Sequence, residues 1–554
     1  EPGPPSEAAM TLAPEQEEAV AALAEGIAAR SFLPYLLHGV TASGKTEVYL
    51  RAAAATLAQE RQVLVLLPEI ALTHPVAREF GARFGRRVSL LHSGLSDVQR
   101  LAQWRRLAAG EVDLAVGARS AVFAPLPRLG LIVVDEEHDP SYKHEGGLPY
   151  QARDVALYRG KLAGAAVVLV SATPSLGAYY RAQKGDYRYL QLSRRVTPQA
   201  LPDISLVDLK RERGGKDFRV ISRPLAAALE EVLGKGEQAL LFLNRRGYAT
   251  ALFCLFCGEV RQCPDCSVAL TQHRARGLLQ CHYCGHTEPV PDRCPACQSG
   301  AVKHYGVGTE RVEAELARLF PGARVGRLDR DTAPHSGRAL SLLEDFGAGR
   351  VDLLVGTQMV TKGHHFPGVT LVGVIAADLS LHFPEYHAGE RTFQLLAQVA
   401  GRAGRGEAPG RVIIQTYHPE HYVFRNLINQ DYQGFYDEEA AARQTLGYPP
   451  FTRLALVRLS GPDEALVARE AARLGETARD LVRRDPELAS RLRVLGPAPA
   501  GLAKLKGRHR WQLLVKSCGL GPRNRLLERL RKEWRPPPGS RLDLTLDIDP
   551  AKVW

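Results

Sequence analysis

A short glycine-bearing segment near the start of the chain constrains the fold more than any other feature. Residues 39–46 read Gly-Val-Thr-Ala-Ser-Gly-Lys-Thr and fit the pattern G-x-x-x-x-G-K-[ST]. An apolar run at 35–37 precedes the segment, and a helix-favouring stretch at 47–51 follows it. A strand, a glycine loop and a helix in this order form a phosphate-binding loop in a parallel α/β fold. The segment therefore predicts such a fold with a bound nucleotide.

Each residue type in this loop has a role in holding nucleotide. Lys45 neutralises the β- and γ-phosphates, the Thr46 hydroxyl binds Mg²⁺, and the backbone N–H groups cradle the phosphates. The predicted contacts are Gly39, Val40, Thr41, Ala42, Ser43, Gly44, Lys45 and Thr46. ATP and Mg²⁺ are therefore two of the predicted cofactors.

A second apolar run ends in acids, because residues 131–138 read Leu-Ile-Val-Val-Asp-Glu-Glu-His. Asp135 would hold Mg²⁺ through water, and Glu136 would orient or deprotonate the attacking water. An acidic strand end by itself is typical of a solvated loop, but the phosphate loop favours the catalytic interpretation. Lys45, Asp135 and Glu136 are the predicted catalytic residues of this part of the chain.

Short apolar runs separated by helix-length segments occur in two sets, one in each half of the chain. Such runs predict parallel sheets covered by helices on both faces. A cysteine-rich segment follows the run at 239–243, so we expect a metal module inserted after the first strand of the second lobe. The predicted boundaries are a linker at 1–13, lobes at 14–192 and 193–443, the insertion at 250–300 and a C-terminal α+β domain at 444–554.

Eight of the nine cysteines form four C-x-x-C pairs. Eight thiolates fill two tetrahedral Cys₄ zinc sites, which have no open position and are therefore structural. A nested arrangement assigns one zinc to Cys254, Cys257, Cys294 and Cys297, and the other to Cys263, Cys266, Cys281 and Cys284. Sequential pairing is the alternative that stays open. The neighbouring His273, His282 and His286 are predicted to be packed or solvated instead of bound to zinc.

The cysteine pattern favours metal over disulfides, which indicates a reducing, cytoplasmic compartment. The net charge of +12 and the pI near 9.3 favour a polyanionic partner. No apolar run approaches the ~18 residues of a membrane span. Residues 491–512 contain six Lys or Arg and no acid, beside Trp511, which predicts a phosphate track. The alternative for that stretch is an ordinary solvated basic face.

Several further segments resemble motifs of superfamily 2 helicases. Residues 135–138 resemble the DExH box, 171–174 motif III, 356–367 motif V and 398–405 motif VI. The resemblance implies two RecA-like lobes and an arginine that stabilises charge on the transferred phosphoryl group. We expect Arg405 to be this arginine, with Arg402 nearly equal to it, on one side of a helix.

The chain as a whole resembles the PriA (primosomal protein N′) family of bacterial replication-restart helicases. The resemblance depends on residues 39–49, 68–73, 92–94, 135–143, 242–247, 306–310 and 448–451, and on the four cysteine pairs directly after 242–247. It implies an ATP-dependent helicase that moves 3′→5′ at branched forks and helps to reload the replicative helicase. The implied partners are single-stranded and forked DNA, single-stranded DNA-binding protein and other primosome components, and the chain is expected to be a monomer without a membrane.

The resemblance also identifies residues for nucleotide and DNA contact. Gln16 resembles the adenine-reading glutamine, and residues 139–151 resemble an aromatic-rich loop that couples DNA contact to hydrolysis. Rings that stack on bases and cations that meet phosphates suit that task. The predicted DNA contacts are Tyr142, Lys143, Tyr150, Lys504, Lys506, Arg508, Arg510 and Trp511. The alternative for the first three is a polar surface loop with a packed tyrosine.

The resemblance does not extend to two parts of the family, the N-terminal domain that captures the 3′ end and the winged helix. Recognition of a 3′-OH end at a fork is therefore not implied for this chain. Two other functions stay open as alternatives. One is a generic superfamily 2 translocase that acts on RNA or duplex DNA. The other is a scaffold that loads the replicative helicase without using its own ATPase.

Overall fold

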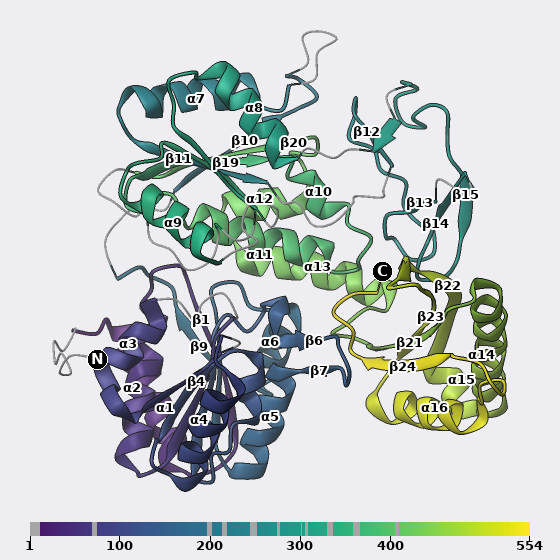
Figure 1. Cartoon of the computed structure of the whole chain (residues 1–554), viewed down its shortest axis with the longest axis horizontal. Coiled ribbons are helices and arrows are strands. Elements are labelled where there is room, and N and C mark those ends of the chain that lie inside the picture. Colours follow the sequence, from purple (N-terminus) through teal and green to yellow (C-terminus); the bar gives the residue numbers. More distant parts are fainter. Residues whose placement is uncertain are drawn as a thin grey trace. The chain divides into compact units, whose positions relative to one another are not determined.

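The computed structural model describes residues 11–68, 75–92, 94–196, 202–212, 219–243, 252–273, 277–300, 302–304, 308–329, 336–357, 360, 366–404 and 409–553. The chain divides into two compact units. One comprises residues 1–201 with 359–365, and the other comprises residues 202–358 with 366–554. Figure 1 shows the elements of both, coloured along the sequence.

A parallel seven-stranded sheet forms the centre of the first unit. Its strands are β1 (Leu33–Gly39), β2 (Gln62–Leu66), β3 (Val88–Leu91), β4 (Leu114–Gly117), β5 (Leu129–Val134), β8 (Ala166–Ser171) and β9 (Arg188–Leu192). They follow the order β3-β4-β2-β5-β8-β1-β9 with parallel pairing throughout. The helices are α1 (Pro14–Ala28), α2 (Lys45–Ala58), α3 (Pro75–Phe84), α4 (Asp97–Ala109), α5 (Ala152–Ala163) and α6 (Leu176–Gln183). Both the phosphate loop after β1 and the acids after β5 lie at carboxyl ends of this sheet.

The central strands of this sheet bury both faces. Every residue of β2, β4, β5 and β8 is buried, because helices or neighbouring strands cover both sides. Leu37, Val65, Val133 and Val168 belong to one continuous apolar core. Short 3₁₀ segments, η2 (Gly85–Arg87), η3 (Arg119–Phe123) and η4 (Pro140–Tyr142), and a two-stranded hairpin of β6 (Lys143–His144) and β7 (Tyr150–Gln151) complete the unit.

The second unit contains a six-stranded parallel sheet of the same kind. Its strands are β10 (Asp203–Asp208), β11 (Gln238–Leu243), β17 (Val325–Leu328), β18 (Leu353–Gly356), β19 (Val369–Ile375) and β20 (Arg411–Thr416). They follow the order β10-β20-β19-β11-β18-β17. The helices are α7 (Arg223–Gly234), α8 (Thr309–Leu319), α9 (Ser336–Gly347), α10 (Asp378–Leu381), α11 (Ala388–Ala400), α12 (Tyr422–Ile428) and α13 (Tyr432–Leu446).

The cysteine-rich segment follows β11, which is the second strand of this sheet in chain order. The expectation of an insertion after the first strand is therefore wrong. The strand before it, β10, lies at the sheet edge and alternates between buried and partly exposed positions, so it lacks the continuous apolar run of a central strand. The insertion itself contains β12 (Leu252–Cys254) paired with β16 (Val302–His304), and β13 (Thr271–His273), β14 (Leu278–Gln280) and β15 (Thr287–Pro289).

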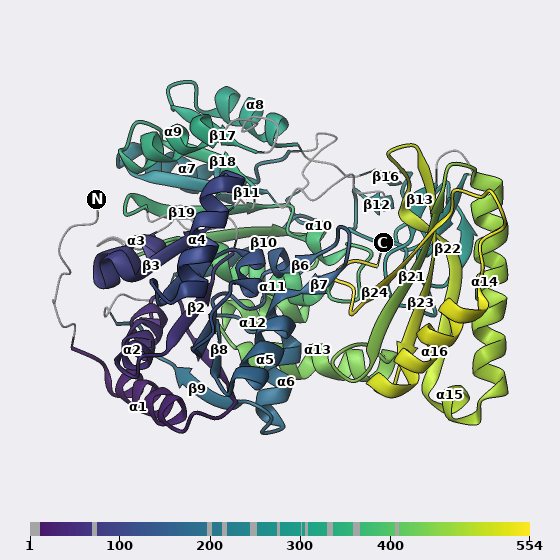
Figure 2. The ribbon, with the colours of Figure 1, turned by 60° about the horizontal axis from the view of Figure 1, so that its bottom comes forward.

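An antiparallel sheet of order β22-β23-β21-β24 ends the chain, as the prediction of a C-terminal α+β domain requires. The elements are β21 (Arg453–Gly461), α14 (Glu464–Arg484), α15 (Pro486–Arg491), β22 (Leu492–Leu505), β23 (Arg508–Ser517), α16 (Leu520–Glu533) and β24 (Asp543–Ile548). Figure 2 shows α14 and α16 beside this sheet, and Leu474, Leu526 and Val515 share its core. Two parallel α/β sheets, a cysteine module and this domain confirm the predicted fold class.

Within the part of the chain that the structure describes, no helix combines the length and the apolar character needed to cross a membrane.

Candidate active site and metal centres

The phosphate loop joins β1 to α2 and has a backbone that favours small residues. Ala42 and Gly44 have positive φ angles of 64° and 77°, which turn successive N–H groups toward one side. The Lys45 ammonium donates to the carbonyl oxygens of Gly39 at 2.7 Å and Val40 at 3.1 Å. The cation therefore lies over the loop, where it would meet a phosphate.

Gln16 reaches the same loop from α1. Its side-chain N–H donates to the Ser43 carbonyl at 2.9 Å, and its oxygen accepts from the Ala13 N–H at 2.9 Å. A side chain on Gly44 would begin 2.1 Å from the Gln16 amide nitrogen, so only glycine allows this approach. The structure thus brings the predicted adenine-reading residue and the predicted phosphate loop together.

Asp135 lies at the end of β5 and is linked to the phosphate loop by a tyrosine. The Tyr49 hydroxyl, which is fully buried on α2, lies 3.2 Å from Asp135 Oδ2 and 3.4 Å from Thr46 Oγ1. Burial and the neighbouring Glu136 raise the pKa of Asp135 to about 7, while Lys45 opposes the rise. The two predicted Mg²⁺-binding residues are therefore neighbours, and the sequence analysis did not assign Tyr49.

Glu136 follows in the left-handed region with φ 46°. Its Oε2 is buried and accepts no hydrogen bond from the described residues, although it lies 3.6 Å from His138 Nδ1. His138 Nδ1 in turn lies 2.8 Å from the Ser171 hydroxyl oxygen. A carboxylate in this position has lone pairs available for water or metal. The donor set of Thr46 and Asp135 therefore fits a hydrated Mg²⁺ ion, and Glu136 has lone pairs available for the attacking water.

The third acid of the box has a structural role that sequence reasoning missed. Glu137 is 1% exposed, and its carboxylate accepts from the Arg153 guanidinium at 2.9 Å and from the Ser175 hydroxyl at 3.0 Å. These contacts connect the acidic box to α5 and to the loop after residues 171–174. The run of three acids gives no signal in sequence to separate this residue from its neighbours.

The aromatic-rich segment after the box differs from the prediction at two positions. Tyr142 is completely buried, and its hydroxyl oxygen lies within hydrogen-bond distance of the carbonyl oxygens of Leu66, at 2.9 Å, and Asp135, at 2.6 Å. Lys143 is 4% exposed. Both side chains are almost fully buried, so this placement does not present them to DNA. The packed-tyrosine alternative therefore describes Tyr142 correctly.

The rest of that segment does reach the surface. Tyr150 is half-buried, and its ring centroid lies 5.0 Å from Phe123 and 5.2 Å from His144. Phe123 is 47% exposed and Leu148 is 83% exposed. The exposed aromatic and apolar surface therefore comes from the hairpin tip, which lies within the predicted segment 139–151, and from η3, which the sequence analysis did not single out.

Arg402, one of the two predicted arginines, does not lie in a helix. Helix α11 ends at Ala400 with Gly401 as its C-cap, and Arg402 lies in the turn beyond, where its N–H donates to the Val399 carbonyl at 3.0 Å. The expected helix therefore ends before Arg402. Arg405 lies outside the described residues, as do 69–73, 93, 244–247, 306–307, 358–359 and 361–365 of the other motifs.

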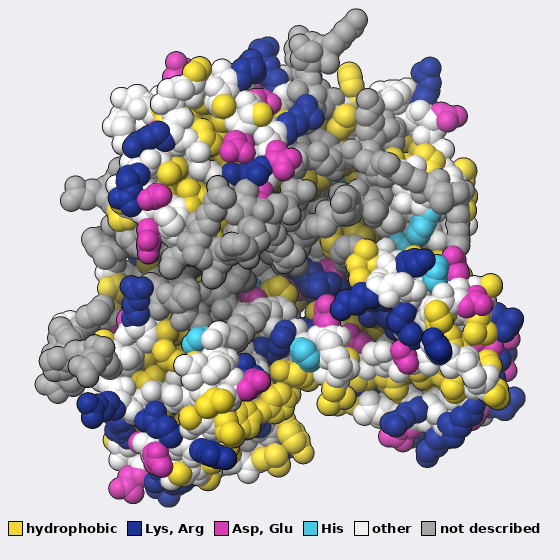
Figure 3. All heavy atoms as spheres, viewed as in Figure 1, with side chains coloured by type: hydrophobic (Ala, Val, Ile, Leu, Met, Phe, Trp, Pro, Cys, Tyr) yellow, Lys and Arg dark blue, Asp and Glu magenta, His cyan; other side chains and the backbone are white. Residues whose placement is uncertain are grey.

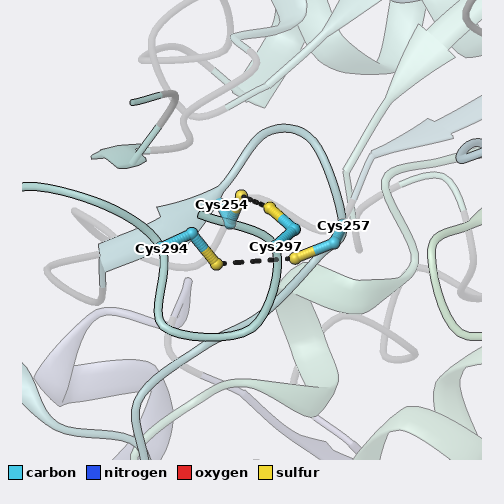
Figure 4. Close-up of side chains that lie close together, drawn as sticks. All are labelled: Cys254, Cys257, Cys294 and Cys297. Atoms are coloured by element: carbon cyan, nitrogen blue, oxygen red, sulfur yellow. Dashed lines mark hydrogen bonds between the residues drawn. The ribbon is translucent and has the colours of Figure 1, made fainter. Parts of the chain in front are cut away.

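The first thiolate centre brings together the outer two cysteine pairs (Figure 4). Its members are Cys254, Cys257, Cys294 and Cys297. The sulfur atoms of Cys254 and Cys297 lie 3.6 Å apart, as do those of Cys257 and Cys294. A zinc ion with Zn–S bonds of about 2.3 Å in tetrahedral geometry requires S···S distances of about 3.8 Å, whereas a disulfide needs about 2.05 Å. The spacing therefore fits zinc.

The second centre joins the inner two pairs and is more deeply buried. Its members are Cys263, Cys266, Cys281 and Cys284. Backbone N–H groups of Tyr283 and His286 donate to the sulfurs of Cys281 and Cys284 at 3.4 Å each. Such bonds stabilise thiolates. The nested pairing is confirmed, and sequential pairing is wrong.

Among the three nearby histidines, His282 is packed as predicted. It is 3% exposed, its Nδ1 lies 2.7 Å from the Pro499 carbonyl oxygen, and burial lowers its pKa to about 4. None of the three belongs to a thiolate centre within the described residues.

The second centre also forms part of a core shared with the C-terminal domain. Cys263, Cys266 and Cys281 belong to the same apolar cluster as Tyr448, Leu456 and Leu514. The Tyr448 hydroxyl donates to the Cys266 carbonyl at 3.0 Å, and the Lys516 ammonium lies 3.5 Å from the Tyr448 ring centroid. The zinc module thus supports the terminal domain.

The predicted basic track forms a hairpin of β22 and β23. Its two-residue turn is Lys506-Gly507, with φ angles of 49° and 76°, as a tight hairpin turn requires. Lys504 and Lys506 are exposed, whereas the Arg508 guanidinium lies 2.6 Å from the Asp543 carboxylate. Arg510 is half-buried, and Trp511 is half-buried against the apolar core of the domain. Figure 3 shows Lys and Arg side chains on the terminal domain, with Asp and Glu side chains among them.

The sequence matches define first a class of protein. Residues 13–180 match the family described as "DEAD/DEAH box helicase", which agrees with a phosphate loop and an acidic box at the carboxyl ends of one parallel sheet. Residues 263–289 match the "PriA DNA helicase Cys-rich region (CRR) domain", and residues 444–551 match the "Primosomal protein N C-terminal domain". The chain has a helicase-type α/β core with a zinc module and a primosomal terminal domain.

Individual relatives then define the family. A protein from Bacillus subtilis, "Replication restart protein PriA", is 45% identical over 92% of this chain and 62% of its own length. A Treponema pallidum protein of the same description is 42% identical over 98% of this chain and 80% of its own length. The chain belongs to the PriA family of replication restart proteins. It spans 62% of the length of the Bacillus relative and of a Synechocystis one.

Among solved structures, one described as "Structure of RecG bound to three-way DNA junction" is similar to this chain. The match covers 78% of this chain and 46% of the RecG chain, with 18% sequence identity and a TM-score of 0.46.

Proposed function

We propose that this chain is an ATP-dependent DNA helicase that moves 3′→5′ on single-stranded DNA at branched replication forks and helps to reload the replicative helicase during replication restart. The observation that carries the proposal is the linkage of Thr46, Tyr49 and Asp135 within hydrogen-bond distance at one sheet edge. The names of the relatives and the cysteine module support DNA replication restart as the process.

The described residues have distinct roles in the proposed hydrolysis. Lys45 neutralises the phosphates, Thr46 and Asp135 hold Mg²⁺, and Glu136 orients or deprotonates the attacking water. Mg²⁺ held by Thr46 and Asp135 would supply positive charge that neutralises the charge developing on the phosphates. Gln16 holds the base side of the site through its contact with the loop.

ATP turnover with and without a synthetic fork tests this proposal. We expect fork-stimulated turnover in the unaltered chain and its loss in Lys45→Ala. Lys161→Ala is the matched control, because Lys161 is an exposed lysine on α5 of the same unit, and it should keep full turnover. Equal rates in the unaltered chain and Lys45→Ala would refute the phosphate-loop assignment.

Substituting RNA for the fork distinguishes the generic translocase. Stimulation by RNA equal to that by the fork would favour the generic translocase over a fork-specific helicase. A loading assay tests the scaffold function. If the Lys45→Ala variant loads the replicative helicase as well as the unaltered chain does, the scaffold function is favoured.

The arginine of the proposed site is Arg405, with Arg402 as the near-equal alternative. Separate Arg405→Gln and Arg402→Gln variants should differ in turnover at saturating ATP. Replacing the arginine that stabilises the transferred phosphoryl group should lower turnover by about 10³-fold or more. An equal, small effect from both would contradict the assignment.

The DNA contacts that we propose are Tyr150 on the first unit and Lys504, Lys506 and Arg510 on the terminal hairpin. Each exposed lysine that meets a phosphate should reduce the dependence of log affinity on log salt by about one unit when removed. We also propose single-stranded DNA-binding protein and other primosome components as partners, a monomeric state and a cytoplasmic location, which suits zinc-bound thiolates.

A further inference from the structure

A third cluster of metal-binding side chains lies outside both thiolate centres, in the second unit. Asp378, His382 and His418 each place one ligand atom so that the three atoms lie within 4.8 Å of one another. Asp378 begins α10, His382 is the C-cap of that helix, and His418 follows the end of β20. The cluster comes from two chain segments that no motif in the sequence connects.

The carboxylate of this cluster is held in a fixed orientation. Asp378 is 1% exposed; its Oδ1 accepts from the Thr416 hydroxyl at 2.7 Å, and its Oδ2 accepts from the Tyr417 N–H at 2.9 Å. Each carboxylate oxygen has a second lone pair that these bonds do not use. Hydrogen bonds that orient a carboxylate while leaving lone pairs available are typical of the outer shell of metal sites.

The imidazole of His418 is oriented in a similar way. Its Nε2 lies 3.2 Å from the Gly258 carbonyl oxygen. An Nε2–H that donates to this carbonyl leaves the lone pair of the ring on Nδ1, as in histidines that bind metals. Gly258 has φ +84°, and a side chain there would begin 2.8 Å from His418 Nε2 and 2.5 Å from the Tyr417 Cβ. Only glycine lets this carbonyl reach the ring.

The second imidazole, that of His382, has a buried nitrogen that indicates a bound ligand. His382 Nε2 is buried and has no hydrogen-bond partner among the residues that the structure describes. The ring centroid lies 5.5 Å from that of His418, with the ring planes at 76°. Phe253 contributes an apolar ring 5.9 Å away, so the surroundings of the nitrogen are partly apolar. A buried imidazole nitrogen without a partner is costly unless something binds it.

We propose that Asp378, His382 and His418 form a third metal site, for a divalent transition ion such as Zn²⁺. Two imidazoles and a carboxylate are a ligand set that zinc and related ions accept, whereas Mg²⁺ and Ca²⁺ prefer oxygen ligands. Three protein ligands leave a fourth position for water. Because Gly258 directly follows Cys257, the site is hydrogen-bonded to the loop of the first thiolate centre.

Metal analysis of the zinc-loaded full chain after gel filtration tests the site. We expect three zinc ions per chain in the unaltered protein and two in His382→Gln. His509→Gln is the matched control, because His509 lies in the same unit on β23 and belongs to no ligand cluster of the described residues, and it should keep three. Two zinc ions in the unaltered chain, or three in His382→Gln, would overturn the proposal.

Cobalt gives a second measurement that needs no variant. The zinc-loaded chain, titrated with Co²⁺ after selective removal of its weakest-bound zinc, should take up one Co²⁺ with visible d–d absorption. The absorption should lack a sulfur-to-metal charge-transfer band, because the proposed ligands contain no sulfur. A charge-transfer band would place the ion on a cysteine, with Cys518 as the thiol outside the two centres, and would refute the proposed ligands.

Discussion

Replacing Tyr49 by phenylalanine should weaken Mg²⁺ binding in a way that depends on pH. The substitution keeps the buried ring and removes the hydroxyl that lies 3.2 Å from Asp135 Oδ2. This hydroxyl favours the charged carboxylate, whereas burial and Glu136 favour the protonated form and raise the pKa of Asp135 to about 7. A proton on Asp135 competes with Mg²⁺, so losing the hydroxyl should increase that competition.

The magnitude follows from the energy of a hydrogen bond to a charged group. A bond worth about 1.5–3 kcal/mol corresponds to about 1–2 pKa units. The pKa of Asp135 should then rise from about 7 to roughly 8–9. At pH 7 the ionised fraction would fall from about half to between a tenth and a hundredth, and the Mg²⁺ concentration for half-maximal turnover would rise roughly 5- to 50-fold.

The assay is ATP turnover against Mg²⁺ concentration at several pH values between 6 and 9. The fold difference in Mg²⁺ requirement between Tyr49→Phe and the unaltered chain should be largest at pH 6 and should shrink as the pH passes the raised pKa. Tyr35→Phe is the matched control, because it also loses a buried hydroxyl, which donates to the Ala22 carbonyl at 3.0 Å, in the same core. Equal Mg²⁺ dependence in Tyr49→Phe and the unaltered chain, or the same shift in Tyr35→Phe, would refute the reasoning.

Three other perturbations test different parts of the structure. Arg153→Ala should lower the free energy of unfolding by about 3–5 kcal/mol, because it leaves the buried Glu137 carboxylate unpaired; a denaturant midpoint close to that of the unaltered chain would contradict this. Chelation of zinc should increase hydrogen exchange around Tyr448, because Tyr448 shares a core with the second centre. Unchanged exchange would show that this core does not depend on the zinc. Burial lowers the pKa of Lys516 to about 8, below its unfolded value, so the free energy of unfolding should rise between pH 8 and about 10. Lys516→Met should lack that rise, and an equal slope in both proteins would contradict the buried charge.

The sequence predicted the central strands well because these strands are apolar on both faces. The runs at 63–67, 131–134, 166–170 and 239–243 all became buried strands. The edge strands β3, β9, β10 and β17 gave no such run, since one side of an edge strand contacts water or a single helix. Sequence alone therefore described the interior of both sheets and left their edges out.

The candidate site shows the same division. Lys45, Thr46 and Asp135 are recognisable because the chemistry of phosphate and Mg²⁺ restricts their residue types and their place after a strand. Tyr49 and Tyr142 are two of the residues that hold Asp135, and both read in sequence as ordinary aromatic residues. Their roles depend on contacts across 86 and 7 positions of the chain, which no local pattern encodes.

The metal centres separate in a similar way. Four C-x-x-C pairs predict two zinc sites by counting alone, and the nested grouping follows from their spacing. The cluster of Asp378, His382 and His418 has no such spacing, because a helix and a strand end bring it together. The expected helix at Arg402 was wrong for a local reason, since Gly401 ends α11 one residue earlier.

The core that joins the second zinc centre to the terminal domain sets an order for biosynthesis. His282 and Gln512, which hydrogen-bond across this core, are 230 residues apart in the chain. At about 5–20 residues per second, the ribosome needs on the order of 10–50 s to add that length. During this interval the second zinc centre has been synthesised, but the strands of the terminal domain that cover it have not. The apolar face around Cys281 therefore stays uncovered by the terminal sheet on the nascent chain until β23 emerges.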